Sequence, residues 1–326
     1  DKGIKANKKY RYKIVSYQSE AIDKENSKLS RWFSTKTIVN TKHQRYSYSE
    51  MSRDIHQLKA AYGDRVHYQV IGKSVDGRNL YDVIIGNPNA KKTLLVVSNL
   101  HAREYMTVQL CMAQIEYYLK NYYRSISGTV PVNVFEKIAV RFVPMANPDG
   151  VTISQYGIRA IHKASLRKTL RKMPGANRHR LWKANARGID INRNYAEGFD
   201  RGGAKTPEHK QYAGKTPISE PETKAQVSVV EKVKPDVVIC YHQAGEVMYH
   251  LNHTKLSNML YSMTHYTHII SGKTHYGTFS DYLDARNILN CTLETGLTPA
   301  PVKNSMYKKI YKTNKDVLVA VAKMYL

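Results

Sequence analysis

Apolar runs and helix-spaced apolar residues alternate along most of this chain. Short apolar runs have the length of buried strands, and they lie at residues 92–100, 137–147, 235–242 and 288–295. Apolar residues recur at helical spacing in four longer stretches, at residues 47–63, 105–123, 219–233 and 305–326. Two further strand-like segments, residues 66–74 and 80–87, are joined by Asp76-Gly77 and predict a hairpin. Strands that alternate with helices predict an α/β fold whose mixed, mostly parallel twisted sheet is flanked by helices.

Local signals predict where some of these elements begin and end. Ser47 and Ser49 are candidate N-caps for the first helix. Ser219 and Glu222 have the spacing of a capping box for the helix at 219–233. The Pro-Asp-Gly sequence at 148–150 is a strong turn signal, so we expect a turn after the strand at 137–147.

The first 45 residues differ from the rest of the chain. Residues 9–17 could form one strand, but the remainder is polar and weakly patterned. We therefore expect an N-terminal extension at residues 1–45 and one catalytic domain at residues 46–326. The chain begins with Asp rather than Met, so we expect a processed or trimmed product in which no signal peptide is seen.

The charge of the chain is strongly positive. Lysine and arginine number 51 against 26 acidic residues, which gives a net charge of +25. Such a protein is expected to bind polyanions, and residues 151–187 carry ten basic and no acidic residues. That stretch has neither aromatic platforms nor a known fold signature for nucleic acid, so no specific nucleic-acid partner is expected.

Cysteines and hydropathy exclude two other classes. Cys111, Cys240 and Cys291 lie far apart in apolar segments, which predicts buried free thiols rather than a disulfide framework. No apolar stretch approaches the roughly 20 residues of a membrane span, so no transmembrane segment is expected.

Three of the expected strands end in residues that bind metals or protons. The strand at 92–100 leads to His101 and Glu104, the strand at 235–242 ends in His242, and the strand at 288–295 carries Glu294 near its end. Ligands of open α/β sheets bind outside the carboxyl ends of the strands. Two histidines and one carboxylate match the ligand set of catalytic zinc, and a second carboxylate is needed to accept the proton of the attacking water.

Taken alone, a His-x-x-Glu pattern is weak, because it arises by chance in many chains. Arg103, between the candidate ligands, can reach a substrate oxygen. Asn192-Arg193-Asn194 is either a salt-bridged turn or a fork of donors for a substrate carboxylate.

Six segments together resemble the zinc carboxypeptidase family. They are HARE at 101–104, NPDG at 147–150, GIDINRNY at 188–195, SEPET at 219–223, CYHQ at 240–243 and TLETG at 292–296. They follow the family's order at compatible spacings and cover residues 46–326. The resemblance implies the family fold, an eight-stranded mixed sheet flanked by helices, and one zinc ion per chain.

The resemblance also implies roles for individual residues. His101, Glu104 and His242 would be the zinc ligands, and Glu294 the general base. Arg103 would line a substrate subsite. Asn192 and Arg193 would clamp the free carboxylate next to the scissile bond.

Two positions depart from the digestive carboxypeptidases. The family arginine that polarises the scissile carbonyl follows a tryptophan, where this chain has Lys183, and Arg187 lies nearby. Either cation could take that role. The mobile family tyrosine falls near Gly272-Lys273, and Tyr276 is the tyrosine closest to it.

The segments WKANARGIDINRNY and YHQAGEVMYH are more similar to a bacterial branch of the family. That branch cuts the γ-D-glutamyl–diamino acid bond of peptidoglycan stem peptides. Ser280 aligns near the residue that sets side-chain specificity, and it is neither acidic nor bulky. Glu246 is either a plain surface carboxylate or the partner of a diamino acid's side-chain ammonium.

The sequence therefore favours a zinc-dependent peptidase that hydrolyses peptidoglycan stem peptides at the γ-D-glutamyl–diaminopimelate bond. An ordinary metallocarboxypeptidase acting on protein C-termini is the alternative, and a catalytically dead, basic cell-wall-binding protein is a third. We expect stem peptides and anionic cell-wall polymers as partners. The expected location is secreted, periplasmic or cell-wall-associated.

Overall fold

A computed structural model describes residues 37–252, 254–270 and 276–326, together with the backbone of four short strands near the N-terminus. Of those four strands, β1 (Lys9–Tyr10) pairs with β4 (Phe33–Ser34), and β2 (Lys13–Gln18) pairs with β3 (Ala21–Leu29). The strand expected at residues 9–17 thus falls on β1 and β2, and residues 11–12 lie outside the described part.

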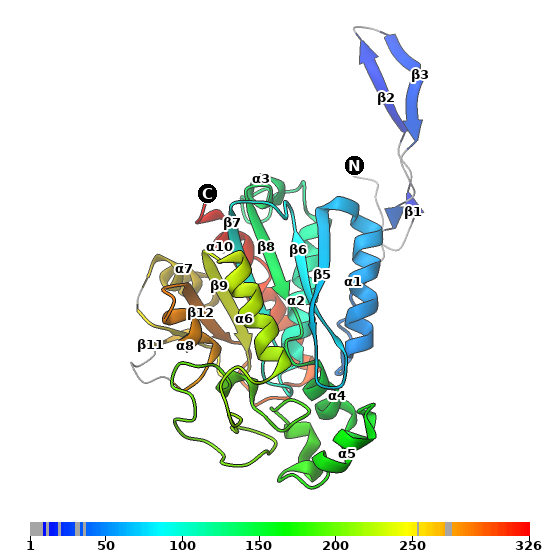
Figure 1. Cartoon of the computed structure of the whole chain (residues 1–326). Helices are drawn as coiled ribbons and strands as arrows, with labels where there is room; N and C mark the ends of the chain where they lie inside the picture. Colours follow the sequence, from blue (N-terminus) through cyan, green and yellow to red (C-terminus); the bar gives the residue numbers. More distant parts are fainter. Residues whose placement is uncertain are drawn as a thin grey trace.

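One eight-stranded sheet organises the remainder of the protein (Figure 1). Its strands are β5 (Val66–Lys73), β6 (Asn79–Ile85), β7 (Lys92–Ser98), β8 (Ile138–Val143), β9 (Val237–His242), β10 (Val247–His250), β11 (Thr267–Ile270) and β12 (Leu289–Glu294). They lie in the order β11-β10-β12-β9-β7-β8-β6-β5. The pairs β10–β11, β12–β9, β9–β7 and β7–β8 are parallel and the others antiparallel, which confirms a mixed, mostly parallel sheet.

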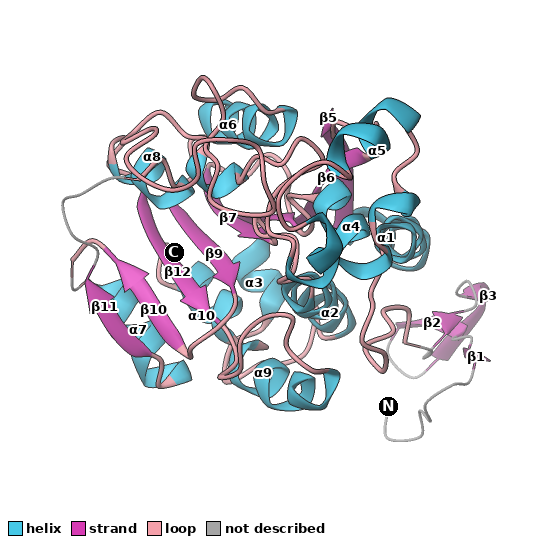
Figure 2. Cartoon of the chain, turned by 90° about the horizontal axis from the view of Figure 1, so that it is seen from below, coloured by secondary structure: helices cyan, strands magenta, loops and turns pink. Residues whose placement is uncertain are grey.

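Helices cover both faces of this sheet (Figure 2). They are α1 (Tyr48–Tyr62), α2 (Met106–Lys120), α3 (Pro131–Phe135), α4 (Pro148–Tyr156), α5 (Ala164–Leu170), α6 (Pro221–Val233), α7 (Lys255–Thr264), α8 (Phe279–Asp284), α9 (Tyr307–Asn314) and α10 (Val317–Lys323). None of the helices among the described residues is long and apolar enough to cross a bilayer.

Strand β7 shows why the sheet needs helices on both faces. Its alternate residues enter two different cores: Leu94 and Val96 pack with α1, α2, α9 and α10, whereas Leu95 and Val97 pack with α6 and α8. Because successive side chains of a strand point to opposite faces, an unbroken apolar run produces a strand buried on both sides. Cys111, Cys240 and Cys291 are buried and free, as expected.

The structure corrects two predictions about helix starts. Residues 148–150 form no turn but the first turn of α4, because Asn147 caps it by accepting the Gly150 N–H and Pro148 occupies the first helical position. Ser219 and Glu222 form no capping box, because Glu220 is the N-cap residue of α6 and makes no side-chain capping bond. The capping box of α1, by contrast, is built on Ser47 rather than Ser49.

The helix expected at residues 305–326 is divided into α9 and α10. Gln114 of α2 donates a hydrogen bond of 2.8 Å to the Asn314 carbonyl, which a continuous helix would use itself. The break between α9 and α10 therefore follows from a tertiary contact, which the spacing of apolar residues cannot predict.

Candidate metal centre and active site

The carboxyl ends of three adjacent strands bring the candidate residues together. Strands β12, β9 and β7 are neighbours and run parallel, so their ends meet at one edge of the sheet. His242 and Glu294 are the last residues of β9 and β12, and they pair directly in register. His101 and Glu104 lie in the turn that follows β7, where Asn99 adopts φ 63°.

His101, Glu104 and His242 form one compact buried group. Glu104 Oε1 lies 3.0 Å from His101 Nδ1, and Glu104 Oε2 lies 2.9 Å from His242 Nδ1. The two Nδ1 atoms are 3.1 Å apart. Each of the three residues offers one metal-ligating atom to a common centre.

This donor set fits a zinc ion. Ligand atoms at zinc's usual distances in a tetrahedral site lie about 3.3 Å apart, close to the separations in this group. Two imidazole nitrogens that face each other at 3.1 Å can share only one proton, so a cation suits the pair better than solvent does. The fourth tetrahedral position would be left for a water or a substrate oxygen.

The electrostatics of the group also favour a metal. Burial alone would raise the pKa of Glu104, but His101 and His242 hold that pKa well below its usual range. Burial lowers the pKa of His242; burial would also lower the pKa of His101, but Glu104 and Asp190 raise it. An ionised carboxylate and a neutral imidazole are the protonation states that bind metals.

Glu294 stands beside this group as an unshared carboxylate. Burial, followed by the charge of Glu104, raises the pKa of Glu294 to about 8. Its Oε2 atom is buried and has no hydrogen-bond partner among the described residues. A carboxylate in this state can accept a proton near neutral pH, as a general base must.

The structure distinguishes the two cations that the sequence left open. The Lys183 ammonium lies 3.9 Å from Glu104 Oε1, so it faces the metal group. Arg187 is half-exposed and pairs instead with Glu220 at 3.5 Å. Lys183 is therefore the cation placed to meet a substrate carbonyl.

Arg103 and Arg193 are available to a substrate. The buried Nε of Arg103 has no hydrogen-bond partner in the described part of the chain. Arg193 donates to the carbonyl of Asn192 at 2.7 Å and forms no ion pair with any described carboxylate. The Asn192 side chain accepts the N–H of Phe279 at 2.9 Å, which ties the Asn192-Arg193 segment to the start of α8.

Two other expected substrate residues, Ser280 and Tyr276, form hydrogen bonds with residues outside the metal group. Ser280 Oγ lies 3.3 Å from Thr292 Oγ1, two residues before Glu294 on β12. Tyr276 is exposed, and its N–H donates to Asp281 at 2.8 Å. The alternative position, residues 272–273, lies outside the described residues.

Glu246 does not present a free carboxylate. It forms an ion pair with Lys309 of α9 at 2.8 Å. A diamino acid ammonium would have to displace Lys309, and so the structure favours the interpretation of Glu246 as a structural surface carboxylate.

Asp190 is a site residue that the sequence analysis did not single out. Its Oδ1 lies 3.4 Å from His101 Nε2, and its carboxylate also accepts the N–H groups of Asn192 and Gln211. Burial would raise the pKa of Asp190, but His101, Arg193 and Lys183 hold it well below its usual range. A carboxylate behind a ligating histidine fixes the ring's orientation and basicity. Its place inside the GIDINRNY segment was the available signal.

Asp190→Asn should weaken zinc binding by roughly 10–100-fold, because the amide orients His101 without the carboxylate's charge. The measurement is zinc affinity by competition with a chromophoric chelator, with Asp200→Asn on an exposed loop as the control. Equal zinc affinity in wild type and Asp190→Asn would remove Asp190 from the metal centre.

The SEPET segment holds the loop that carries Lys183. Asn185 donates to Glu220 at 2.7 Å and to Glu222 at 3.1 Å, and Glu222 also accepts the Val75 N–H at 3.3 Å. Both glutamates are buried. Burial, followed by the charge of Asp149, raises the pKa of Glu222 to about 8.

This shift predicts a pH-dependent stability. The unfolded chain releases the Glu222 proton near pH 4.5, whereas the folded protein retains it up to about pH 8, so the group's contribution to stability falls as pH rises between these values. The unfolding free energy of Glu222→Gln minus that of wild type should therefore rise by roughly 1 kcal/mol per pH unit across that window. Above about pH 8 this difference should level off. Urea unfolding at several pH values measures the difference, and a difference that stays constant with pH would contradict the prediction.

Comparison with known proteins supports this site. The sequence profile of the zinc carboxypeptidase family matches residues 51–310. The chain belongs to the zinc carboxypeptidase family. As a member it is a zinc metallopeptidase, and the group His101, Glu104 and His242 is its potential metal site.

One curated relative of this family member is the gamma-D-glutamyl-L-diamino acid endopeptidase 1 of Lysinibacillus sphaericus. It is 26% identical over 289 residues, which cover 85% of this chain and 72% of the relative. Alignments with several other curated relatives span about half of their length.

Solved structures share the fold. The thrombin activatable fibrinolysis inhibitor superposes with a TM-score of 0.71 at 18% identity, covering 88% of this chain and 76% of that one. The murein-tripeptide amidase MpaA from Escherichia coli O157 superposes with a TM-score of 0.53 at 20% identity, covering 77% of this chain and 91% of that one. Both confirm the carboxypeptidase-like α/β architecture.

Proposed function

We propose that this protein hydrolyses the bond between γ-D-glutamyl and diaminopimelate residues in peptidoglycan stem peptides, with one zinc ion per chain. The observation that carries the chemistry is the buried group of His101, Glu104 and His242 with Glu294 beside it. The substrate class is supported by the similarity to the Lysinibacillus sphaericus endopeptidase over 85% of the chain. With this substrate, we propose a secreted, periplasmic or cell-wall-associated location.

Each residue of the site has a part in this proposal. Bound zinc would polarise the scissile carbonyl and lower the pKa of water. Glu294 accepts the proton of the attacking water and later gives it to the leaving amine. Lys183 stabilises negative charge that develops on the carbonyl oxygen. Arg193 and Asn192 hold the free carboxylate of the residue after the cut, while Arg103 binds the glutamyl side.

The competing function is removal of C-terminal residues from ordinary peptides. Mass spectrometry of muropeptide digests, compared with digests of a C-terminal peptide library, separates the two. The proposal expects diaminopimelate-containing products from muropeptides and little trimming of the library. Efficient trimming of the library, with muropeptides left intact, would replace the proposal by the ordinary carboxypeptidase.

Arg193→Lys should lower the rate on a stem with a free diaminopimelate carboxylate by roughly 10–100-fold, because lysine cannot reproduce the bidentate guanidinium contact. On stems in which that carboxylate is an amide, the substitution should lower the rate far less. If Arg193 forms the clamp, tripeptide stems should also be preferred over tetrapeptide and pentapeptide stems.

The rates on tri-, tetra- and pentapeptide stems, for wild type and Arg193→Lys, test this clamp. Arg201→Lys, on an exposed loop, is the matched control. Equal wild-type rates on all three stems would indicate an enzyme that cuts internally. So would an Arg193→Lys rate that falls equally on stems with a free and with an amidated carboxylate.

A further inference from the structure

We propose that residues 158–181, here called the basic platform, bind the anionic peptidoglycan polymer itself and hold it beside the active site. This inference rests on the proposed function, and it adds that the preferred substrate is a stem peptide still attached to the polymer rather than a free peptide. The polymer is anionic because its stem peptides carry free carboxylates at many points along each strand.

The basic platform has a single sign of charge. It contains eight lysine or arginine residues and no acidic residue: Arg159, Lys163, Arg167, Lys168, Arg171, Lys172, Arg178 and Arg180. It spans α5 and the short helix Ala176–Leu181 that follows it. Unscreened cations at this density repel one another, and a polyanion relieves that repulsion.

Most of these cations face solvent without a carboxylate partner. Arg159, Lys168, Arg171, Lys172, Arg178 and Arg180 are exposed. Within the described ranges none of these six forms an ion pair. Some exposed cations elsewhere, such as Lys92, Lys205 and Arg286, pair with acidic side chains. The platform differs from the rest of the surface by having no acidic residue among its cations.

The basic platform borders the active site. Lys183, whose ammonium faces Glu104, follows the platform by two residues. Asn147, the cap of α4, donates to the carbonyls of Leu100 and Lys183 at 3.1 and 3.2 Å, so the residue before His101 and the segment just after the platform share one anchor. Figure 1 shows α4 and α5 at the same end of the molecule.

Two further observations place other basic residues near the platform. Burial lowers the pKa of His209; the charge of Glu208 opposes this shift, whereas Lys210, Arg103 and Arg178 add to it, so Arg103 and a platform arginine act on the same ring. On the other side, Arg45 lies over the exposed ring of Tyr156 at 5.5 Å. A polymer that lies on the platform would therefore hold its stem peptides near Lys183 and the metal group.

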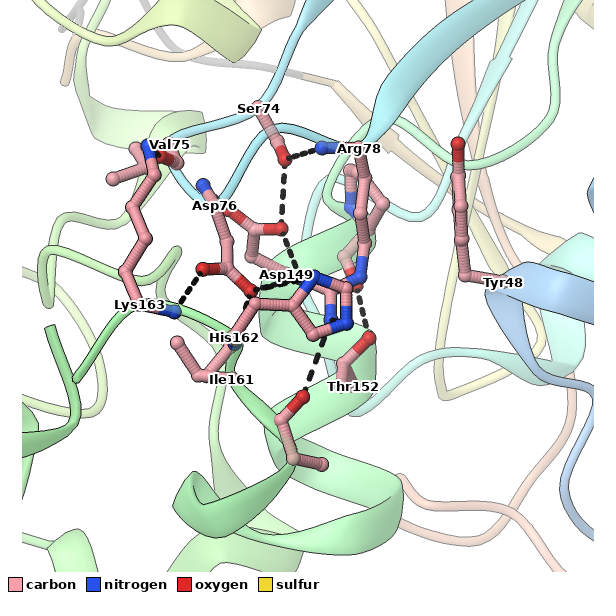
Figure 3. Close-up of polar contacts among 12 residues, drawn as sticks. Tyr48, Ser74, Val75, Asp76, Arg78, Asp149, Thr152, Ile161, His162 and Lys163 are labelled. Carbon is pink, nitrogen blue, oxygen red and sulfur yellow. Dashed lines mark hydrogen bonds and ion pairs between the residues drawn. The ribbon is translucent and has the colours of Figure 1, made fainter.

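Buried ion pairs hold the basic platform in place (Figure 3). The buried Asp76 carboxylate accepts the N–H groups of His162 and Lys163 at 2.7 and 2.9 Å and pairs with Arg78 at 2.6 Å. Arg78 also pairs with Asp149 of α4 at 2.8 Å. The hairpin turn between β5 and β6 thus fixes the start of α5, which presents the cations on a rigid support.

A groove on the platform offers a specific seat for an anionic segment. Its volume is about 420 Å³, and Lys168 and Lys172 line it together with Met173, Thr206 and Pro207. Lys168 lies in α5 and Lys172 in the turn that follows it, and both line this groove. Two ammonium groups above an apolar floor suit a carboxylate-bearing peptide on a saccharide backbone.

The test replaces three exposed platform cations of α5 and the turn after it, in the variant Lys168→Glu/Arg171→Glu/Lys172→Glu. The control, Lys224→Glu/Lys232→Glu/Lys308→Glu, changes the net charge equally at exposed lysines of α6 and α9. Thermal unfolding is measured to check that both variants are folded. Binding of the zinc-loaded protein to insoluble peptidoglycan, stripped of attached phosphodiester polymers, is measured by cosedimentation at low and high salt.

The platform variant should bind the stripped polymer at least roughly tenfold more weakly than wild type at low salt, while the control stays within about twofold. Wild-type binding should weaken as salt screens the charges. Equal binding by wild type and the platform variant, or equal losses in both variants, would overturn the inference. So would wild-type binding that disappears when the phosphodiester polymers are removed, or that is abolished by a slight excess of a single-stranded oligonucleotide.

Hydrolysis is recorded separately, as the ratio of rates on polymer and on a soluble tripeptide stem. The platform variant should lower this ratio, and an unchanged ratio counts against the inference. If no stem is cut but polymer binding depends on the platform, the proposed function fails while the binding surface stands. If stems are cut but polymer binding is the same in the platform variant and wild type, the proposed function stands and the binding surface fails.

Discussion

Glu294→Gln should lower kcat by roughly 10²–10⁴-fold, the usual contribution of a positioned general base. Glutamine has nearly the same shape as glutamate, but it cannot accept the proton of the attacking water. The pKa of Glu294, raised to about 8 by burial and by Glu104, indicates a site that tolerates a neutral side chain. The variant should therefore keep its fold and its zinc.

Steady-state kinetics on a stem peptide, with zinc content measured on the same preparation, test this prediction. Glu136→Gln is the matched control. It removes an exposed carboxylate just before β8, at the amino ends of the parallel strands, whereas the site lies at their carboxyl ends. Near-normal turnover by a zinc-loaded Glu294→Gln protein would show that another group is the base.

His242→Ala should lose both zinc and activity. Removing one of three protein ligands leaves a set that holds zinc far more weakly, and alanine provides no substitute atom near Glu104 Oε2. We expect zinc to fall from one ion per chain to less than about a tenth of that after dialysis.

Metal analysis of the dialysed protein measures this loss. His67→Ala, on the edge strand β5, removes a partly exposed histidine and should retain zinc. Full zinc occupancy in His242→Ala would overturn the assignment of the metal centre.

The apolar pattern was sufficient for six of the eight strands of the main sheet and for the residues at their ends, whereas the short strands β10 and β11 were not predicted from it. Apolar runs mark β7, β9 and β12 because a strand buried on both faces has no polar side, and a polar residue that follows such a run must emerge at the sheet's edge. His101, His242 and Glu294 could thus be placed together before their distances were known.

Predictions that depended on partners distant in sequence were less successful. Glu246 had the position of a specificity residue, but its partner Lys309 is supplied by a helix 63 residues later. Glu222 had the spacing of a cap, but its side chain is buried and accepts hydrogen bonds from Asn185 and Val75, which lie in other loops. Local spacing describes what a side chain could do, and tertiary contacts decide which of those possibilities is used.

The most direct test of the central claim is the identity of the bond cut in a purified tripeptide stem. Zinc-loaded protein is incubated with L-alanyl-γ-D-glutamyl-diaminopimelate, and the products are identified by mass spectrometry, with Glu294→Gln and chelator-treated protein in parallel. The account predicts free diaminopimelate and the dipeptide L-alanyl-D-glutamate from wild type alone. An intact tripeptide, under conditions in which the same preparation removes C-terminal residues from ordinary peptides, would contradict it.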